Sequence, residues 1–296
     1  MKSHKKLQYP WRLGHVAVQL VKRYYAHDVG RDSAALTYYL LFAIFPLLIL
    51  VSTILGILHL NVDLVTNALS QFIPHEVVNI VEMYLDYVSN TTSRELFWFS
   101  LVFSIWFPMR ATSCLMHSVR KAFAKGAPET ILGGQIRTFL FSLGLIFTMG
   151  LTFLMIMFGR RALNFLSRWL TIPQGFIGAW NYLRFVIMGV IMALALALLY
   201  MLAQGERRPL RETLPGVCAS LVAWMLLSLA FSYYVEHFAH YAELYGSIAT
   251  IVVVLLWLYM SGTVLIMGAE LSGTLLEQRK KVWSSAVEDE KQELQK

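Results

Sequence analysis

Long apolar segments alternate with short polar ones along most of the chain. A helix needs about 20 mostly apolar residues to cross the roughly 30 Å hydrocarbon core of a bilayer. We predict six membrane-spanning segments on this basis: 34–59, 96–115, 136–158, 182–203, 214–235 and 247–271. They are rich in Leu, Met, Ala and Phe and are much longer than buried strands, which favours helices. The predicted fold class is therefore an all-α polytopic membrane protein, a bundle of six transmembrane helices.

The polar segments add amphipathic helices at the membrane surface. In the N-terminal segment 1–31, apolar residues recur at helical spacing on one face: Leu13, Val16, Ala17, Leu20, Val21 and Tyr24. This face fits a helix lying on the membrane surface, or equally a helix packed on its own bundle. The long loop 60–95 predicts two further short amphipathic helices, separated by Pro74. The membrane domain is predicted over 32–275, and the charged tail 276–296 is expected to be poorly ordered.

Composition and charge agree with a membrane protein. Only 15% of residues are charged, against about 25% in an ordinary soluble domain. The formal net charge of +7 would suggest nucleic acid in a soluble protein, but here the basic residues concentrate in alternate loops and in both terminal segments. Lys and Arg mark cytoplasmic loops. The pattern therefore predicts cytoplasmic N- and C-termini and no nucleic-acid partner.

Three ionisable residues lie at or near membrane depth. Arg110 falls within the second span, Glu270 near the end of the sixth, and Asp32 just before the first. Because a charge inside the bilayer is costly, such a residue is a functional-site hypothesis by default. An Arg110–Glu270 or Arg110–Asp32 pair would lower that cost. Three interpretations stay open: a static pair holding helices together, a substrate or ion pathway, and snorkelling of Arg110 to the interface.

Two prolines interrupt the same spans. Pro46 follows Tyr38 and Tyr39 in the first span, and Pro108 precedes Arg110 in the second. Proline removes a backbone donor and commonly kinks a helix. Each is either an ordinary kink or a hinge beside an unwound binding segment. The candidate intramembrane polar site thus comprises Arg110, Glu270, Asp32, Tyr38 and Tyr39, with Pro46 and Pro108 as candidate hinges.

One basic cluster lies on the side predicted to be external. It comprises Arg160, Arg161, Arg168 and Arg184. Arginine binds phosphate in a bidentate manner, so these residues are candidate contacts for anions or outer-leaflet lipids. The alternative is ordinary loop charge without a ligand.

The sequence predicts no catalytic residue, cofactor or metal. It contains no glycine-rich nucleotide-binding loop, no metalloprotease HExxH and no serine-hydrolase GxSxG motif. Glu236, His240 and Glu243 share one helical face, a spacing that can ligate a metal, but a second ligand set is not recognisable. Most carboxylates are scattered singly, which gives little support to hydrolysis of a macromolecule.

Several short motifs together resemble a known family. They are Ala34-Ala-Leu-Thr-Tyr-Tyr39 with Phe45-Pro-Leu47, Pro215-Gly216, Tyr245-Gly-Ser-Ile-Ala249, Leu256-Trp-Leu-Tyr259 and Gly268-Ala-Glu-Leu271. In this order and spacing they resemble the YihY / virulence factor BrkB family, formerly mislabelled as ribonuclease BN. The resemblance covers nearly the whole membrane region. It implies a six-helix bacterial inner-membrane protein of unestablished activity, and it supplies no catalytic residue.

Three functions are compatible with these features. The first is transport of a lipid or another amphipathic anion across the inner membrane, with membrane lipids as partners and Arg110 in the pathway. The second is a non-catalytic scaffold or assembly partner in the envelope, in which the polar residues only pack helices. The third is a membrane-bound ribonuclease. A pathway requires access to Arg110, whereas a scaffold can bury it in a closed pair.

Overall fold

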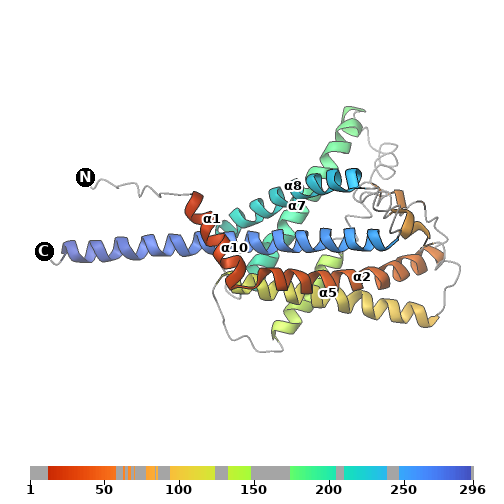
Figure 1. Cartoon of the computed structure of the whole chain (residues 1–296), viewed down its shortest axis with the longest axis horizontal. Coiled ribbons are helices and arrows are strands. Elements are labelled where there is room, and N and C mark those ends of the chain that lie inside the picture. Colours follow the sequence, from red (N-terminus) through yellow and green to blue (C-terminus); the bar gives the residue numbers. More distant parts are fainter. Residues whose placement is uncertain are drawn as a thin grey trace.

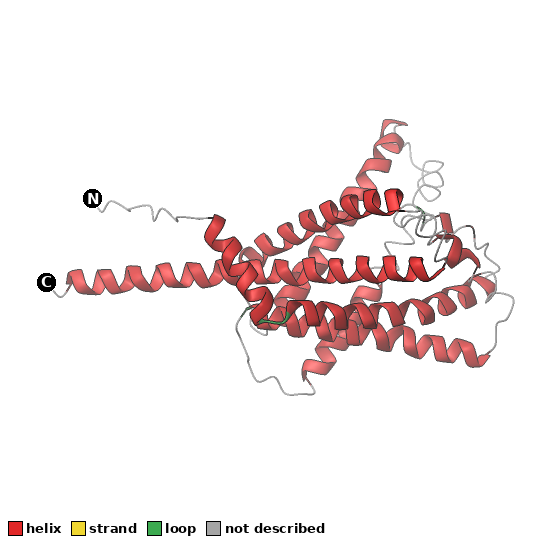
Figure 2. Ribbon diagram, viewed as in Figure 1, coloured by secondary structure: helices red, strands yellow, loops and turns green. Residues whose placement is uncertain are grey.

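A computed structural model describes residues 13–57, 63, 66–67, 70, 78–83, 85, 94–123, 133–147, 174–204, 210–238 and 247–294. Within these ranges the regular elements are helices (Figures 1 and 2). They are α1 (Leu13–Ala26), α2 (Val29–Ile57), α5 (Arg94–Ala122), α7 (Gln174–Ala203), α8 (Leu210–Phe238) and α10 (Ser247–Leu294), with an apolar helix over Gly133–Phe147 between α5 and α7. The predicted all-α class is confirmed.

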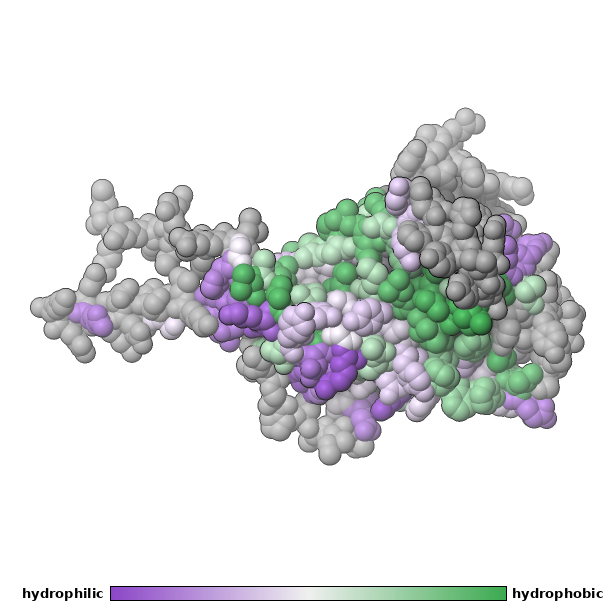
Figure 3. Space-filling model, in the orientation of Figure 1, coloured by the Kyte–Doolittle hydropathy of each residue, from purple (hydrophilic) through white to green (hydrophobic). Residues whose placement is uncertain are grey.

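Four helices are long and apolar enough to cross a membrane, and Figure 3 shows hydrophobic residues gathered over the middle of the bundle. These spans are Val29–Ile54, Glu95–Ala122, Leu210–Val235 and Ile248–Lys280, and they coincide with the first, second, fifth and sixth predicted spans. The third and fourth predicted spans correspond to shorter apolar helices at Gly133–Phe147 and Gly189–Ala203. The third also extends into residues outside the described ranges. The number of six crossings therefore stays a prediction.

The junction between α1 and α2 is a sharp backbone turn. Asp28 adopts a positive φ of 56°, a conformation that Asp tolerates better than most residues. Its carbonyl accepts the first hydrogen bond of α2 from Asp32 N at 3.0 Å, while its carboxylate lies 3.1 Å from Arg31 Nη2. The turn directs α1 away from the axis of α2 and across one end of the bundle, which we call the α1 end (Figure 1).

The buried core gathers where α2, α5, α7, α8 and α10 meet. Its members are mostly aliphatic or small, among them Leu36, Ala111, Val119, Tyr200 and Ala269. Glycines allow the helices to approach closely. A Cβ added at Gly268 would clash with Ser220 and with the backbone of Gly216, and one added at Gly273 would clash with the Ala122 carbonyl.

Both intramembrane prolines lie inside continuous helices. Pro46 is within α2 and Pro108 within α5, so neither marks an unwound segment. The carbonyl of Pro108 accepts a hydrogen bond from Thr112 Oγ1 at 2.8 Å. Their role as hinges stays a prediction.

Two surface segments differ in part from expectation. The tail was expected to be poorly ordered, but α10 continues as a helix to Leu294, beyond the end of the bundle (Figure 1). Its charged residues continue a helix begun by the apolar span. In the loop 60–95, where short helices are predicted, residues 78–83 are helical, and Val78, Val81 and Leu85 are buried. Ser52 Oγ anchors this segment by donating to Leu85 O at 3.0 Å.

The α1 helix lies against α10 and α2 and leaves a second face open. Val16 is buried, whereas Val18, Val21 and Tyr25 are exposed. Packing on its own bundle is therefore correct for one face of α1. The apolar face predicted from the sequence is buried only in part: Val16 is buried and Leu20 and Tyr24 are half-buried, whereas Ala17 and Val21 are exposed.

Candidate functional site

A completely buried carboxylate, Glu270 on α10, forms the first polar centre. Its Oε2 lies 3.0 Å from Arg23 Nη1 and its Oε1 lies 2.6 Å from His27 Nδ1, both contributed by the region of α1. Arg23 also donates to Ala122 O at 2.8 Å and pairs with Glu277 at 2.7 Å. One guanidinium thus joins α1, α5 and α10.

A nearby contact continues the same seam. The hydroxyls of Tyr24 and Tyr259 lie 3.4 Å apart. This hydrogen bond, with a smaller contribution from desolvation, raises the pKa of Tyr24 above its ordinary value. A Cβ on Gly30 would meet the hydroxyls of both tyrosines, so glycine allows α2 to pass close to them.

Asp32, at the start of α2, forms the second polar centre. Its Oδ2 accepts hydrogen bonds from Lys121 Nζ at 2.8 Å and from Ser118 Oγ at 2.7 Å, both on α5. Arg31 lies farther away, with Nε 3.8 Å from Oδ1. This buried carboxylate therefore fixes α2 against α5, with its charge balanced chiefly by Lys121.

Arg110 joins neither centre, so the expected pairs with Glu270 and Asp32 are wrong. The cause is the register of α2 and α5. Asp32 lies beside Ser118 and Lys121, and Arg110 is 11 residues before Lys121 on α5, about 16 Å away along the helix axis. At the level of Arg110, α2 presents Tyr39, whose ring centroid lies 5.7 Å from the guanidinium carbon.

The surroundings of Arg110 are aromatic and open. The residue is exposed, and within the described part of the chain it forms no salt bridge. Phe99, Phe103 and Phe107 precede it on the same side of α5, each ring within 6 Å of the next. Phe107 stacks on Phe42 of α2, which contacts Tyr38. Aromatic rings thus form a stripe along α2 and α5 that ends at a cation.

A third set of polar contacts joins α7, α8 and α10. The completely buried Tyr200 donates to Leu265 O at 2.5 Å and lies 3.0 Å from Ser220 Oγ. Ser272 of α10 bridges to α8, accepting from Gly216 N at 3.0 Å and donating to Thr213 O at 3.1 Å. These hydrogen bonds satisfy polar groups that would otherwise be buried without partners.

Several sequence candidates fall outside what the structure describes. Arg160, Arg161 and Arg168 lie outside the described residues, and of Arg184 only the helical backbone in α7 is described. The side chains of Glu236, His240 and Glu243 are likewise outside. In the part of the chain that is described, three or more His, Cys, Asp or Glu residues do not gather as a metal site would require.

Sequence reasoning missed the partners of both carboxylates. These partners are Arg23, His27 and Lys121. Basic residues are expected on the cytoplasmic side of any membrane protein, so their presence in the sequence does not indicate that they pair with a buried carboxylate. A signal does exist for α1, because Arg23 and His27 stand four residues apart and therefore share a helical face. Nothing local indicates that this face turns toward Glu270, 243 residues or more along the chain.

Comparison with known proteins gives a consistent family. The sequence profile described as Virulence factor BrkB matches residues 20–293. The Bacillus subtilis (strain 168) protein named "Putative ribonuclease-like protein YfkH" is 27% identical over 264 residues, covering 89% of this chain and 96% of that protein.

Longer relatives carry the name UPF0761 membrane protein. The one from Chromohalobacter salexigens is 27% identical over 273 residues, 90% of this chain and 64% of its own length. The one from Pseudomonas aeruginosa (strain LESB58) is 26% identical over 276 residues, 88% of this chain and 62% of its own length. The chain thus spans less than two thirds of these two relatives. No solved structure matches it.

Proposed function

This chain belongs to the virulence factor BrkB family, and from that premise we propose that it is a transport-type protein of the bacterial inner membrane. It moves a lipid or another amphipathic anion across the bilayer. The family is one of membrane proteins, and its relatives' names specify no transported substrate. The proposal therefore rests on the surroundings of Arg110.

The open guanidinium of Arg110 is the observation that carries the proposal. Arg110 lies 16 residues after Arg94 and 12 residues before Ala122, about 24 Å and 18 Å from the two ends of α5. A charge at this depth is costly and is a functional-site hypothesis by default. Asp32 and Glu270 are neutralised by basic partners, whereas Arg110 has an aromatic ring beside it. Its guanidinium can donate hydrogen bonds to an anionic group.

The aromatic stripe fits the apolar part of such a substrate. Phe99 is 51% exposed and Phe42 is 42% exposed, and both belong to the stripe that ends at Arg110. Aromatic rings provide apolar contact area, and an arginine provides planar, bidentate donors for phosphate or carboxylate. An amphipathic anion satisfies both ends of this surface at once.

We further propose six crossings with the α1 end in the cytoplasm. Arg120 and Lys121 lie at that end, and so do Arg23 and Arg31. Accumulation of basic residues on one side supports a cytoplasmic position for it. Cysteine-accessibility labelling of cells with a membrane-impermeant maleimide tests this: a cysteine at exposed position Tyr25 stays unlabelled until the membrane is permeabilised. Labelling of intact cells overturns the orientation.

The transport proposal is tested in proteoliposomes. Purified protein is reconstituted with a fluorescent anionic phospholipid, and loss of fluorescence to a membrane-impermeant quencher reports movement between leaflets. Movement above the protein-free rate is expected for the wild type and for Arg110→Lys, with a marked loss for Arg110→Gln. No movement by the wild type, or equal movement by all three proteins, contradicts the proposal.

A scaffold in the envelope is the second candidate, favoured by the extension of α10. This helix is 48 residues long, and its last residues project beyond the bundle (Figure 1). An exposed charged helix is a suitable surface for a partner protein. In-cell cross-linking from exposed position Trp283 tests the idea. Recovery of a stoichiometric protein partner, lost when the α10 extension is removed, supports a scaffold. Recovery of lipid adducts alone excludes it.

We propose no enzymatic activity. One relative is named ribonuclease-like, so this proposal needs its own test. Purified protein is incubated with transfer RNA and Mg²⁺ or Mn²⁺, and we expect no cleavage above a matched preparation lacking the protein. Cleavage that co-purifies with the protein would overturn the proposal.

A further inference from the structure

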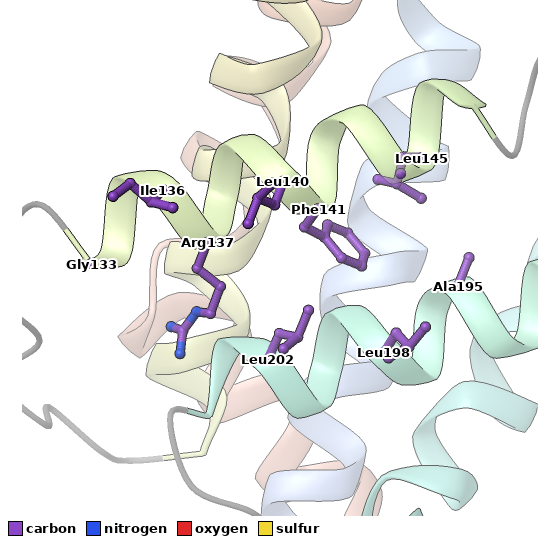
Figure 4. A pocket seen from close by; sticks show the side chains of 10 residues that line it. Gly133, Ile136, Arg137, Leu140, Phe141, Leu145, Ala195, Leu198 and Leu202 are labelled. Carbon is purple, nitrogen blue, oxygen red and sulfur yellow. The ribbon is translucent and has the colours of Figure 1, made fainter.

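An apolar groove, which Arg110 does not line, runs between the Gly133–Phe147 helix and α7 (Figure 4). Its volume is about 540 Å³, within the range of small-molecule sites. Leu140, Phe141 and Leu145 line one wall, and Ala195, Leu198 and Leu202 line the other. Leu140 is 61% exposed and Leu198 is 51% exposed, so the groove opens toward the surroundings of the bundle.

One cation, Arg137, stands at the end of this groove. It is half-buried and extends from the Gly133–Phe147 helix toward Leu202 (Figure 4). Arg137 and Leu202 both lie near the α1 end, because the Gly133–Phe147 helix begins there and α7 ends there. The neighbouring Thr138 contacts Met116 of α5, its Oγ1 3.7 Å from Sδ, which holds this helix in register. Apolar walls with one cation at the membrane surface are complementary to an anionic lipid.

We propose that this groove binds one anionic glycerophospholipid from the leaflet at the α1 end. One acyl chain lies between the leucines of the two helices, and the phosphate contacts the Arg137 guanidinium. Basic pockets between transmembrane helices on the cytoplasmic side are known to bind anionic headgroups. This proposal rests on the proposed function, which names an anionic lipid as the substrate class, and it adds the groove as the place where such a lipid binds.

The groove can be filled without disturbing the fold. Gly144 lines it, and a Cβ at Gly144 would meet nothing within 4 Å. Leucine is also a better helix former than glycine. Gly144→Leu therefore blocks the groove at no expected loss of stability. Gly189 on α7 is a matched control, because it too has open space around its Cβ position and does not line the groove.

The experiment uses the full chain in micelles of zwitterionic lipid. Phosphatidylglycerol with a diazirine on one acyl chain is photolysed in the sample, and the modified residues are mapped by mass spectrometry. Unlabelled phosphatidylglycerol or phosphatidylcholine with identical acyl chains then competes. We expect photoadducts of the wild type on Leu140 or Leu198. Phosphatidylglycerol should displace the probe at least about tenfold more effectively than phosphatidylcholine, because only the anionic headgroup forms a strong charge-assisted hydrogen bond with Arg137.

The variants separate the two parts of the site. Arg137→Gln should abolish the preference for phosphatidylglycerol while keeping the adducts, and Arg137→Lys should retain much of it. Gly144→Leu should remove the groove adducts, and Gly189→Leu should behave as the wild type. Thermal unfolding of each variant confirms that it is folded.

Three results would overturn the inference: adducts that persist in Gly144→Leu, equal competition by the two lipids on the wild type, or photoadducts mapping only outside the groove. Because no transport is measured, the outcome is independent of the liposome assay. If the groove is photolabelled but the protein moves no lipid, only the proposed transport function is refuted. If the protein moves lipid, Gly144→Leu leaves that movement unchanged and the groove is not photolabelled, only the proposed lipid site in the groove is refuted.

Discussion

Replacing Arg23 by alanine should detach α1 from the bundle. Glu270 has no exposed surface, whereas the side chains of Arg23 and His27 are 15% and 28% exposed. The substitution removes the hydrogen bonds to Glu270, to Ala122 O and to Glu277 together. A buried carboxylate that loses its principal partner destabilises a protein by about 3–5 kcal/mol. We expect Arg23→Ala to lose a free energy of unfolding in this range.

The neighbouring residues of the same cluster provide controls. Lys22 is exposed on α1, so Lys22→Ala should change stability by no more than about 0.5 kcal/mol. Glu277 is 50% exposed, and its pair with Arg23 should contribute only about 0–1 kcal/mol. Removing both buried charges, as in Arg23→Met with Glu270→Leu, should recover much of the loss, because an apolar pair often replaces a buried ion pair at little net cost.

The assay is equilibrium unfolding of the purified protein in micelles, followed by circular dichroism and completed as a double-mutant cycle between positions 23 and 270. Limited proteolysis at α1 gives an independent measure of its docking. An Arg23→Ala variant as stable as Lys22→Ala would refute the reasoning. So would additive losses in the double variant, since they would mean that the two side chains do not interact energetically.

Close contacts between the helices make three further changes informative about stability. Gly268→Ala should destabilise by about 1–3 kcal/mol in the same unfolding assay, because the added methyl overpacks the crossing of α8 and α10. Tyr200→Phe should lose about 1–3 kcal/mol, since it removes the buried hydrogen bonds of the Tyr200 hydroxyl with the Leu265 carbonyl and with Ser220 Oγ. Removal of residues 282–296 should leave the unfolding midpoint unchanged, because Trp283 in this extension is 72% exposed; a lowered midpoint would show that the extension packs on the bundle.

The sequence predicts the helices well because a helix that crosses the bilayer needs about 20 consecutive apolar residues, and such stretches are visible in the sequence. Four of the predicted segments coincide with long apolar helices. The prediction of a poorly ordered tail was wrong, because hydropathy marks where an apolar stretch stops and not where a helix stops. The last 23 residues of α10, after Leu271, remain helical to Leu294 with little apolar content.

The polar contacts are harder to predict because they depend on how helices are placed in register. Asp32 and Glu270 are singled out from the sequence by their position at or near membrane depth, and the structure buries both. Their partners could not be assigned, because the offset between α2 and α5 that brings Lys121 to Asp32 and Tyr39 to Arg110 is set by packing. The motif residues Gly216 and Gly268 illustrate the same point: they lie 52 residues apart and meet only at the crossing of α8 and α10.

The proposed function requires that Arg110 contacts an anionic substrate at membrane depth. Its most direct test is the rate at which reconstituted protein moves a fluorescent anionic phospholipid between leaflets, compared between the wild type and Arg110→Gln. Loss of charge-assisted hydrogen bonds worth about 1.5–3 kcal/mol predicts a rate lower by about 10- to 100-fold, with Arg110→Lys in between. Equal rates for the wild type and Arg110→Gln, or a wild-type rate no faster than that of protein-free liposomes, would contradict it.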